Sequence, residues 1–312
     1  MHTTLVSTVL FSLEPHPLHN TLCEKLPAIP GHHSYRHFPD GESYLRIETD
    51  VQGRHCMVLA DLSYPDKKIL PLLFLVDTLR ELGAASVGLV APYLSYMRQD
   101  KRFAAGEAVT SKTFACLLSQ YVDWLVTVDP HLHRYHALSE IYSIPYRVIH
   151  GAPLLAQWLE DQSEILLVGP DAESQQWVSQ VAEQSGHPYV VGEKLRRGDR
   201  DVVVSLPDLA AWKARTAVIV DDVISSGQTV MKCIDSLQKQ GIEQILCAAI
   251  HGIFVEDAEQ QLMKKGISQL ITANSIPHPS NGLDLSELLL APILECLETV
   301  DDLKRFNTDC QE

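Results

Sequence analysis

The sequence predicts an α/β fold with two internally similar domains, each a mostly parallel sheet flanked by helices. Short β-rich segments alternate with helical segments along almost the whole chain, which is typical of parallel sheets with helical crossovers. Several β-rich segments are continuously apolar, as in AVIV at 217–220, and such strands are covered on both faces of the sheet. A length of 312 residues suffices for two domains.

The first half, 1–150, is predicted to form the N-terminal domain. Its strands are short runs of aliphatic and β-branched residues, and its helices repeat apolar residues every three or four positions. We expect strands at Leu5–Phe11, Tyr44–Glu48, Cys56–Asp61, Val87–Pro92 and Trp124–Asp129, and helices at Leu70–Leu82 and Ser111–Gln120.

The second half, 151–312, repeats the alternation from a boundary near Gly151. We expect strands at Ile165–Gly169, Tyr189–Val191, Val202–Leu206, Ala217–Asp221, Ile245–Ile250 and Gln269–Thr272. Helices are expected at Ala152–Leu159, Ser174–Gln184, Gln228–Gln240, Asp257–Lys265 and Ser286–Leu297. The charged stretch Glu193–Arg200 interrupts this series and is predicted to be an exposed, mobile loop.

Composition excludes several classes of function. The chain carries 25 basic and 40 acidic residues, a net charge of −15, which argues against non-specific nucleic-acid binding but permits an anionic small substrate held by local cations or helix N-termini. Apolar stretches are too short to span a bilayer, and no signal peptide precedes them. Seven cysteines without a Cys-x-x-Cys pair indicate reduced thiols and a cytoplasmic protein.

The segment 216–229, TAVIVDDVISSGQT, has the strongest chemical signal. An apolar strand runs into Asp221 and Asp222, and a turn of small polar residues then opens a helix. Backbone N–H groups of such a turn can approach a phosphate closely, and the helix N-terminus adds partial positive charge. The two carboxylates can accept hydrogen bonds from vicinal sugar hydroxyls. An ordinary strand–turn–helix with a serine cap is the alternative.

This segment resembles the phosphoribosyl-pyrophosphate (PRPP) binding motif of the type I phosphoribosyltransferase fold. Phosphoribosyltransferases and ribose-phosphate pyrophosphokinases share that motif, and the first half separates them. There FPDGE at 38–42, PYLSYMRQDK at 92–101 and DPH at 129–131 resemble pyrophosphokinase motifs. The same order continues with GPD at 169–171, KLR at 194–196, HGIF at 251–254 and NSIP at 274–277.

The resemblance implies an ATP site in the first half. It assigns Arg98, Gln99, Asp100 and His131 to ATP, with His131 working beside Mg²⁺. It also implies that a neighbouring subunit contributes the FPDGE loop, with Phe38 stacked on adenine and Asp40 and Glu42 facing the nucleotide. A site shared in this way makes the protein a homo-oligomer.

The resemblance implies a ribose 5-phosphate site in the second half. The 5-phosphate binds the turn, and the carboxylates of Asp171, Asp221 and Asp222 hold the ribose hydroxyls, with Asp171 also a metal ligand. Lys194 and Arg196 act on the transferring diphosphoryl group. The turn residues are Ser225, Ser226, Gly227, Gln228 and Thr229.

The implied reaction is transfer of the diphosphoryl group of Mg-ATP to ribose 5-phosphate, giving PRPP and AMP. Three residues depart from the commonest family pattern, namely Ser225 and Gln228 in the turn and Glu173 after Asp171. Two alternatives remain open: a phosphoribosyltransferase that uses PRPP, and a non-catalytic subunit that regulates an active synthase.

Overall fold

The computed structural model describes residues 7–132, 134–196 and 202–309, and the chain divides into two compact units. Unit 1 contains the chain up to Ile149 together with the residues from Ser286 onward. Unit 2 is His150–Leu285. Among the described residues, none of the helices has both the length and the hydrophobicity needed to cross a membrane.

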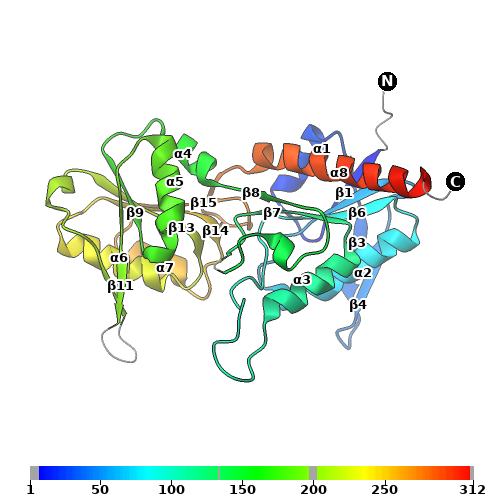
Figure 1. Ribbon diagram of the computed structural model, residues 1–312, viewed down its shortest axis with the longest axis horizontal. Coiled ribbons are helices and arrows are strands. Elements are labelled where there is room, and N and C mark those ends of the chain that lie inside the picture. Colours follow the sequence, from blue (N-terminus) through cyan, green and yellow to red (C-terminus); the bar gives the residue numbers. More distant parts are fainter. Residues whose placement is uncertain (1–6, 133, 197–201, 310–312) are drawn as a thin grey trace. The chain divides into compact units, whose positions relative to one another are not determined.

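Unit 1 is built on a six-stranded sheet in which every neighbouring pair is parallel (Figure 1). The central strands are fully buried, as their continuous apolar sequences predict. In sheet order the strands are β2 (Ile29–Pro30), β1 (Thr8–Ser12), β5 (His55–Leu59), β6 (Ser86–Ala91), β7 (Trp124–Val128) and β8 (Tyr146–Ile149).

Helices of unit 1 bury apolar stripes against this sheet. In α2 (Ile69–Glu81), Leu72, Leu75, Val76 and Leu79 are fully buried, which is the spacing of one face of a helix. The other helices are α1 (Leu18–Lys25), α3 (Thr110–Tyr121) and α8 (Ser286–Asp309), with 3₁₀ turns at Pro65–Lys67 and Leu138–Glu140. A separate antiparallel hairpin joins β3 (His33–His37) to β4 (Ser43–Ile47).

Unit 2 contains a second six-stranded parallel sheet. Its strand order is β10 (Tyr189–Val191), β9 (Ile165–Gly169), β13 (Thr216–Ile224), β14 (Ile245–Gly252), β15 (Gln269–Ala273) and β16 (Asn281–Leu283). The helices are α4 (Ala152–Leu159), α5 (Gln175–Ser185), α6 (Gln228–Lys239) and α7 (Ala258–Lys264), with 3₁₀ turns at Ala172–Ser174 and Ala210–Trp212. The predicted fold class, two parallel sheets flanked by helices, is therefore confirmed.

The stretch predicted as a mobile loop is in part regular structure. Glu193–Arg196 forms strand β11, which pairs antiparallel with β12 (Val202–Ser205) in a two-stranded sheet. The expectation of a loop is therefore wrong for these four residues, because backbone pairing with β12 outweighs their polar composition. The rest of the predicted loop, 197–200, lies outside the described residues.

The C-terminal helix packs within unit 1, although it follows unit 2 in sequence. It was expected at Ser286–Leu297 and runs on to Asp309. Leu289, Ile293, Cys296 and Val300 are buried on one side of it, and it contacts α1, β7 and β8. The residues expected as one C-terminal half, 151–312, are thus divided between the two units.

Candidate functional site

Two aspartates lie where β13 leaves the buried part of the second sheet. Asp221 accepts a hydrogen bond from the backbone N–H of Asp222 at 3.1 Å, and Asp222 accepts one from Val223 N at 2.8 Å. The pKa of Asp221 lies well above its usual range, first because the carboxyl group is desolvated and then because Asp222 and Asp171 are close. Clustered carboxyl groups at a strand end can accept hydrogen bonds from ligand hydroxyls or bind a cation.

The turn after these acids exposes the beginning of α6. Gly227 adopts a left-handed backbone (φ 68°) immediately before the helix, and as the N-cap residue it has no side chain to cap the first turn. Ser226 and Gln228 are exposed, while Ser225 and Thr229 are partly buried. The first backbone N–H groups of a helix have no partner within it, so this end of α6 can accept an anion.

Asp171 and Lys194 meet near the same sheet edge, although 23 positions separate them. Asp171 caps the turn after β9, because its Oδ1 accepts from Glu173 N at 2.9 Å and Ser174 N at 3.3 Å. Its Oδ2 lies 2.6 Å from Lys194 Nζ, and Glu173 Oε2 lies 3.9 Å from the same ammonium group. The cation predicted to act on the diphosphoryl group is thus held by carboxylates.

Lys194 remains protonated, and therefore positively charged, in this environment. Burial lowers its pKa, but the hydrogen bond to Asp171 and the carboxylates of Glu173 and Asp221 raise the pKa more, so the net shift is upward. The structure therefore brings Lys194 together with Asp171 and Asp221. The backbone of Arg196 lies in β11 opposite Val202, and the position of its side chain is not described.

In unit 1 the predicted nucleotide residues follow β6. Arg98 is exposed and Gln99 is partly buried, and the carbonyl of Gln99 accepts from Ser111 N at the start of α3. Asp100 is buried and its Oδ1 lies 2.7 Å from Arg134 Nη1. Arg98 is therefore exposed to solvent, while the two residues that follow it are held by contacts to α3 and to Arg134.

Sequence reasoning missed the partner of Asp100. Arg134 lies in the segment after β7, and Tyr135 from the same segment donates its hydroxyl to the Asp100 carbonyl at 3.1 Å. The basic residue in HRYH at 133–136 is the only sequence signal for this pairing. His131, the predicted ATP and metal residue, is partly buried three positions before Arg134.

The FPDGE loop forms the tip of the β3–β4 hairpin. Phe38 N donates to the Glu42 carbonyl at 2.8 Å, and Glu42 N donates to Asp40 Oδ1 at 3.2 Å. Phe38 is 41% exposed, and the Arg36 guanidinium lies 4.8 Å from the centroid of its ring. These hydrogen bonds fix the tip of the hairpin within itself.

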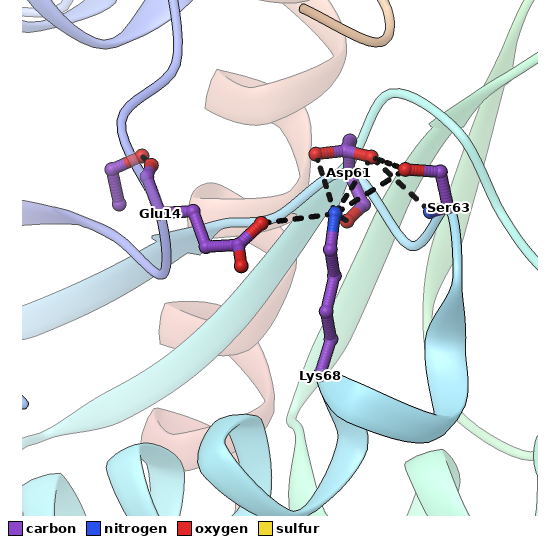
Figure 2. A network of polar contacts seen from close by, with 5 residues as sticks. Glu14, Asp61, Ser63 and Lys68 are labelled. Carbon is purple, nitrogen blue, oxygen red and sulfur yellow. Dashed lines mark hydrogen bonds and ion pairs between the residues drawn. The ribbon is translucent and has the colours of Figure 1, made fainter. Parts of the chain in front are cut away.

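A buried lysine at the start of α2 is a second feature that the sequence did not reveal. Lys68 Nζ lies 2.9 Å from Asp61 Oδ2, 3.0 Å from Glu14 Oε2 and 3.3 Å from Ser63 Oγ (Figure 2). Asp61 and Ser63 follow β5, and Glu14 follows β1. These groups join two loops at the carboxyl edge of the unit 1 sheet.

Within the described part of the chain, no three His, Cys, Asp or Glu side chains are arranged to hold a metal ion by themselves. The two predicted metal residues, His131 and Asp171, belong to different units. Carboxylate oxygens such as those of Asp171 and Asp222 nevertheless have the ligand chemistry that Mg²⁺ prefers, with water and substrate oxygens completing its shell.

Comparison with known proteins assigns a domain family to each part of the chain. Residues 8–121 match the N-terminal domain of ribose phosphate pyrophosphokinase, and residues 137–280 match the phosphoribosyl transferase domain. A ribose-phosphate pyrophosphokinase of Methanothermobacter thermautotrophicus is 33% identical over 261 residues, which are 83% of this chain and 88% of that relative. This chain belongs to the ribose-phosphate pyrophosphokinase family. The resemblance drawn from the motifs is thereby confirmed.

Other members of the family extend the match over nearly the full chain. The ribose-phosphate pyrophosphokinase of Methanopyrus kandleri is 29% identical over 296 residues, covering 94% of this chain and 99% of that relative. The crystal structure of phosphoribosylpyrophosphate synthetase from Mycobacterium smegmatis has the same fold. It superimposes with a TM-score of 0.81 at 24% identity and covers 94% of this chain and 99% of that chain.

Proposed function

We propose that this chain is a ribose-phosphate pyrophosphokinase that converts ATP and ribose 5-phosphate to PRPP and AMP. One observation carries the proposal: a match to the phosphoribosyl transferase domain occurs in one chain with a match to the N-terminal domain of ribose phosphate pyrophosphokinase. The second domain accounts for a ribose phosphate, and the first accounts for a nucleotide donor.

In unit 2 the ribose 5-phosphate binds across the end of β13. The 5-phosphate accepts hydrogen bonds from the hydroxyls of Ser225, Ser226 and Thr229 and from the backbone N–H groups of the turn, which also contains Gly227 and Gln228. The carboxylates of Asp221 and Asp222 accept hydrogen bonds from the ribose hydroxyls. Asp171 lies beside them and is joined to Lys194.

In unit 1 the nucleotide binds at the segment after β6. Arg98 and Gln99 contact the base and phosphates, and Asp100 and His131 complete this part of the site. The ring of Phe38 and the carboxylates of Asp40 and Glu42 come from the hairpin of a neighbouring copy, which makes the active form a homo-oligomer. Arg36 lies over the Phe38 ring, so a base stacked on Phe38 would lie on the face opposite Arg36.

The reaction forms one bond and breaks one. The anomeric oxygen of ribose 5-phosphate attacks the β-phosphorus of ATP, and the bond from that phosphorus to the α–β bridging oxygen breaks, so that AMP leaves. The proton of the anomeric hydroxyl passes to a nearby carboxylate or to water. Transfer of this kind depends mainly on positioning and charge neutralisation.

Lys194 and Arg196 supply positive charge during the transfer. Negative charge moves onto the departing AMP oxygen, so cations placed there stabilise the transition state more than the bound substrates. For Lys194 this requires exchange of its contact with Asp171 for a contact with the diphosphoryl group. Mg²⁺, when bound, would neutralise phosphate charge. In unit 2 the carboxylates of Asp171 and Asp222 would help to hold it, and in unit 1 His131 is the residue proposed for this role.

The alternatives differ in what purified protein does alone. A ribose-phosphate pyrophosphokinase releases AMP from ATP only when ribose 5-phosphate is added. A phosphoribosyltransferase instead consumes PRPP in the presence of a nucleobase, and a regulatory subunit does neither. Release of AMP that depends on ribose 5-phosphate supports the proposal. Consumption of PRPP with a nucleobase, in the absence of such AMP release, overturns it. We expect this activity in the cytoplasm, without nucleic-acid or membrane partners.

A further inference from the structure

The segment that carries Arg98 begins at a residue with an unusual backbone. Tyr96 has φ 60°, a left-handed conformation that residues with a Cβ rarely adopt. Such a conformation persists only where surrounding contacts hold it, and it is concentrated at binding and catalytic sites. Because Arg98 lies two residues further along, the backbone at Tyr96 determines where Arg98 is presented.

Two side chains hold Tyr96 in place. Its hydroxyl donates to Asp66 Oδ1, in the 3₁₀ turn before α2. Its ring packs against Phe114 of α3, with the ring centroids 4.7 Å apart. The pKa of Tyr96 is raised to about 12, first because of the hydrogen bond to Asp66 and then because of burial. The phenol therefore stays protonated, and remains a donor, at neutral pH.

The loop that carries Asp66 is itself fixed by the buried lysine of Figure 2. Lys68 follows Asp66 by two residues, and its ammonium group binds Asp61 and Glu14 at 2.9 and 3.0 Å. A cation is unfavourable at a helix N-terminus, so the carboxylates determine its position. The same loop is also joined directly to the nucleotide segment, because Leu62 N donates to the Tyr93 carbonyl at 3.0 Å.

We propose that Tyr96 is a positioning residue for nucleotide binding, and that its hydrogen bond to Asp66 fixes the segment that presents Arg98 and Gln99. The proposal rests on the proposed function, because it takes ATP as the ligand of that segment. Neither Tyr96 nor Asp66 needs to touch ATP. Without the hydrogen bond between Tyr96 and Asp66, the backbone at Tyr96 can leave its left-handed conformation, so that Arg98 samples other positions.

The test compares variants that break the link in different ways. Tyr96→Phe keeps the ring contact with Phe114 but removes the hydroxyl, and Asp66→Ala removes the acceptor. Each is expected to raise the KM for ATP and the Kd of ATP, measured without ribose 5-phosphate, by about fivefold to tenfold. The KM for ribose 5-phosphate should change less than twofold. The double variant should be no worse than either single variant.

Two further variants distinguish positioning from a general loss of structure. Asp66→Asn retains a carbonyl acceptor for the phenol and should restore most of the affinity for ATP. Tyr142→Phe removes another phenol hydroxyl of unit 1, one that is buried with no hydrogen-bond partner among the described residues. This control should leave both KM values unchanged.

The outcomes separate this inference from the proposed function. If the wild type binds ATP and releases AMP while Tyr96→Phe and Asp66→Ala bind ATP equally well, the positioning role is overturned and the proposed function stands. A parallel rise in both KM values would also overturn the role, since it indicates a general structural effect. If the wild type neither binds ATP nor releases AMP, the proposed function fails and the inference fails with it.

Discussion

At the scale of single residues, the pairing of Lys194 with Asp171 changes how the substrate-free site is understood. The sequence predicts Lys194 as a free cation on a mobile loop. In the structure its ammonium group lies 2.6 Å from Asp171 Oδ2, and its side chain is 39% exposed. If Lys194 acts as proposed, the diphosphoryl group must replace Asp171 as its partner during turnover.

Lys194→Ala should lower kcat by about 10²-fold, with a smaller change in both KM values. The reason is that this cation stabilises charge that develops only in the transition state. The thermal midpoint should change little, because a partly exposed ion pair contributes about 1 kcal/mol or less. Steady-state kinetics and a thermal melt measure both.

Lys264→Ala, which removes an exposed cation of unit 2, is the control. A normal kcat with a large rise in KM would show that Lys194 serves substrate binding instead.

Asp222→Asn should reduce kcat/KM for ribose 5-phosphate much more than it changes folding. A carboxylate can accept hydrogen bonds from two sugar hydroxyls, whereas an amide offers one acceptor oxygen. The carbonyl oxygen of asparagine can still accept the backbone bond from Val223, so the strand end should keep its form. The measurement pairs kinetics with the thermal midpoint. Unchanged kinetics, or a fall in midpoint large enough to explain the loss, would leave Asp222 with a structural role only.

At the scale of elements, the β3–β4 hairpin and the segment after β6 carry the nucleotide half of the proposed site. Phe38→Ala and Arg98→Ala should each raise the KM for ATP more than the KM for ribose 5-phosphate. The ring offers a stacking surface and the guanidinium offers charge-assisted hydrogen bonds to phosphate. Initial rates measured with each substrate varied in turn give both constants. A change confined to the KM for ribose 5-phosphate would reverse the assignment of the two half-sites.

Some elements can be predicted from the sequence alone, and others cannot. Buried strands such as Ile165–Gly169 are predictable to the residue, because a continuous apolar run has one stable environment. Strands β3 and β11 are not, since HSYRH and EKLR have polar patterns, and backbone pairing with the partner strand decides their conformation. In the same way, the acids and the turn at 221–229 are recognisable locally, whereas the pairs Asp171–Lys194 and Asp100–Arg134 are not, because no spacing rule joins such distant residues.

At the scale of the whole molecule, α8 makes the fold of unit 1 depend on the end of the chain. Ile293→Ala should destabilise the protein by about 3 kcal/mol, because Ile293 is fully buried and the substitution leaves a cavity. Leu294→Ala is the matched control, because Leu294 is the next residue along α8 and is 42% exposed. This substitution should lower the free energy of unfolding by less than about 0.5 kcal/mol. Denaturant unfolding measures both. Equal effects of the two variants would contradict the packing of α8 described above.

In the proposed function, one chain with a net charge of −15 joins a nucleotide half and a ribose phosphate half to transfer a diphosphoryl group. The most direct test of this transfer is incubation of the purified protein with Mg²⁺, ribose 5-phosphate and ATP labelled with ³²P at the β-phosphorus, followed by separation of the products. We predict that the label appears in PRPP, that unlabelled AMP forms in equal amount, and that excess EDTA abolishes both products. Label that remains in a nucleoside diphosphate, or AMP release that is independent of ribose 5-phosphate, would contradict the account.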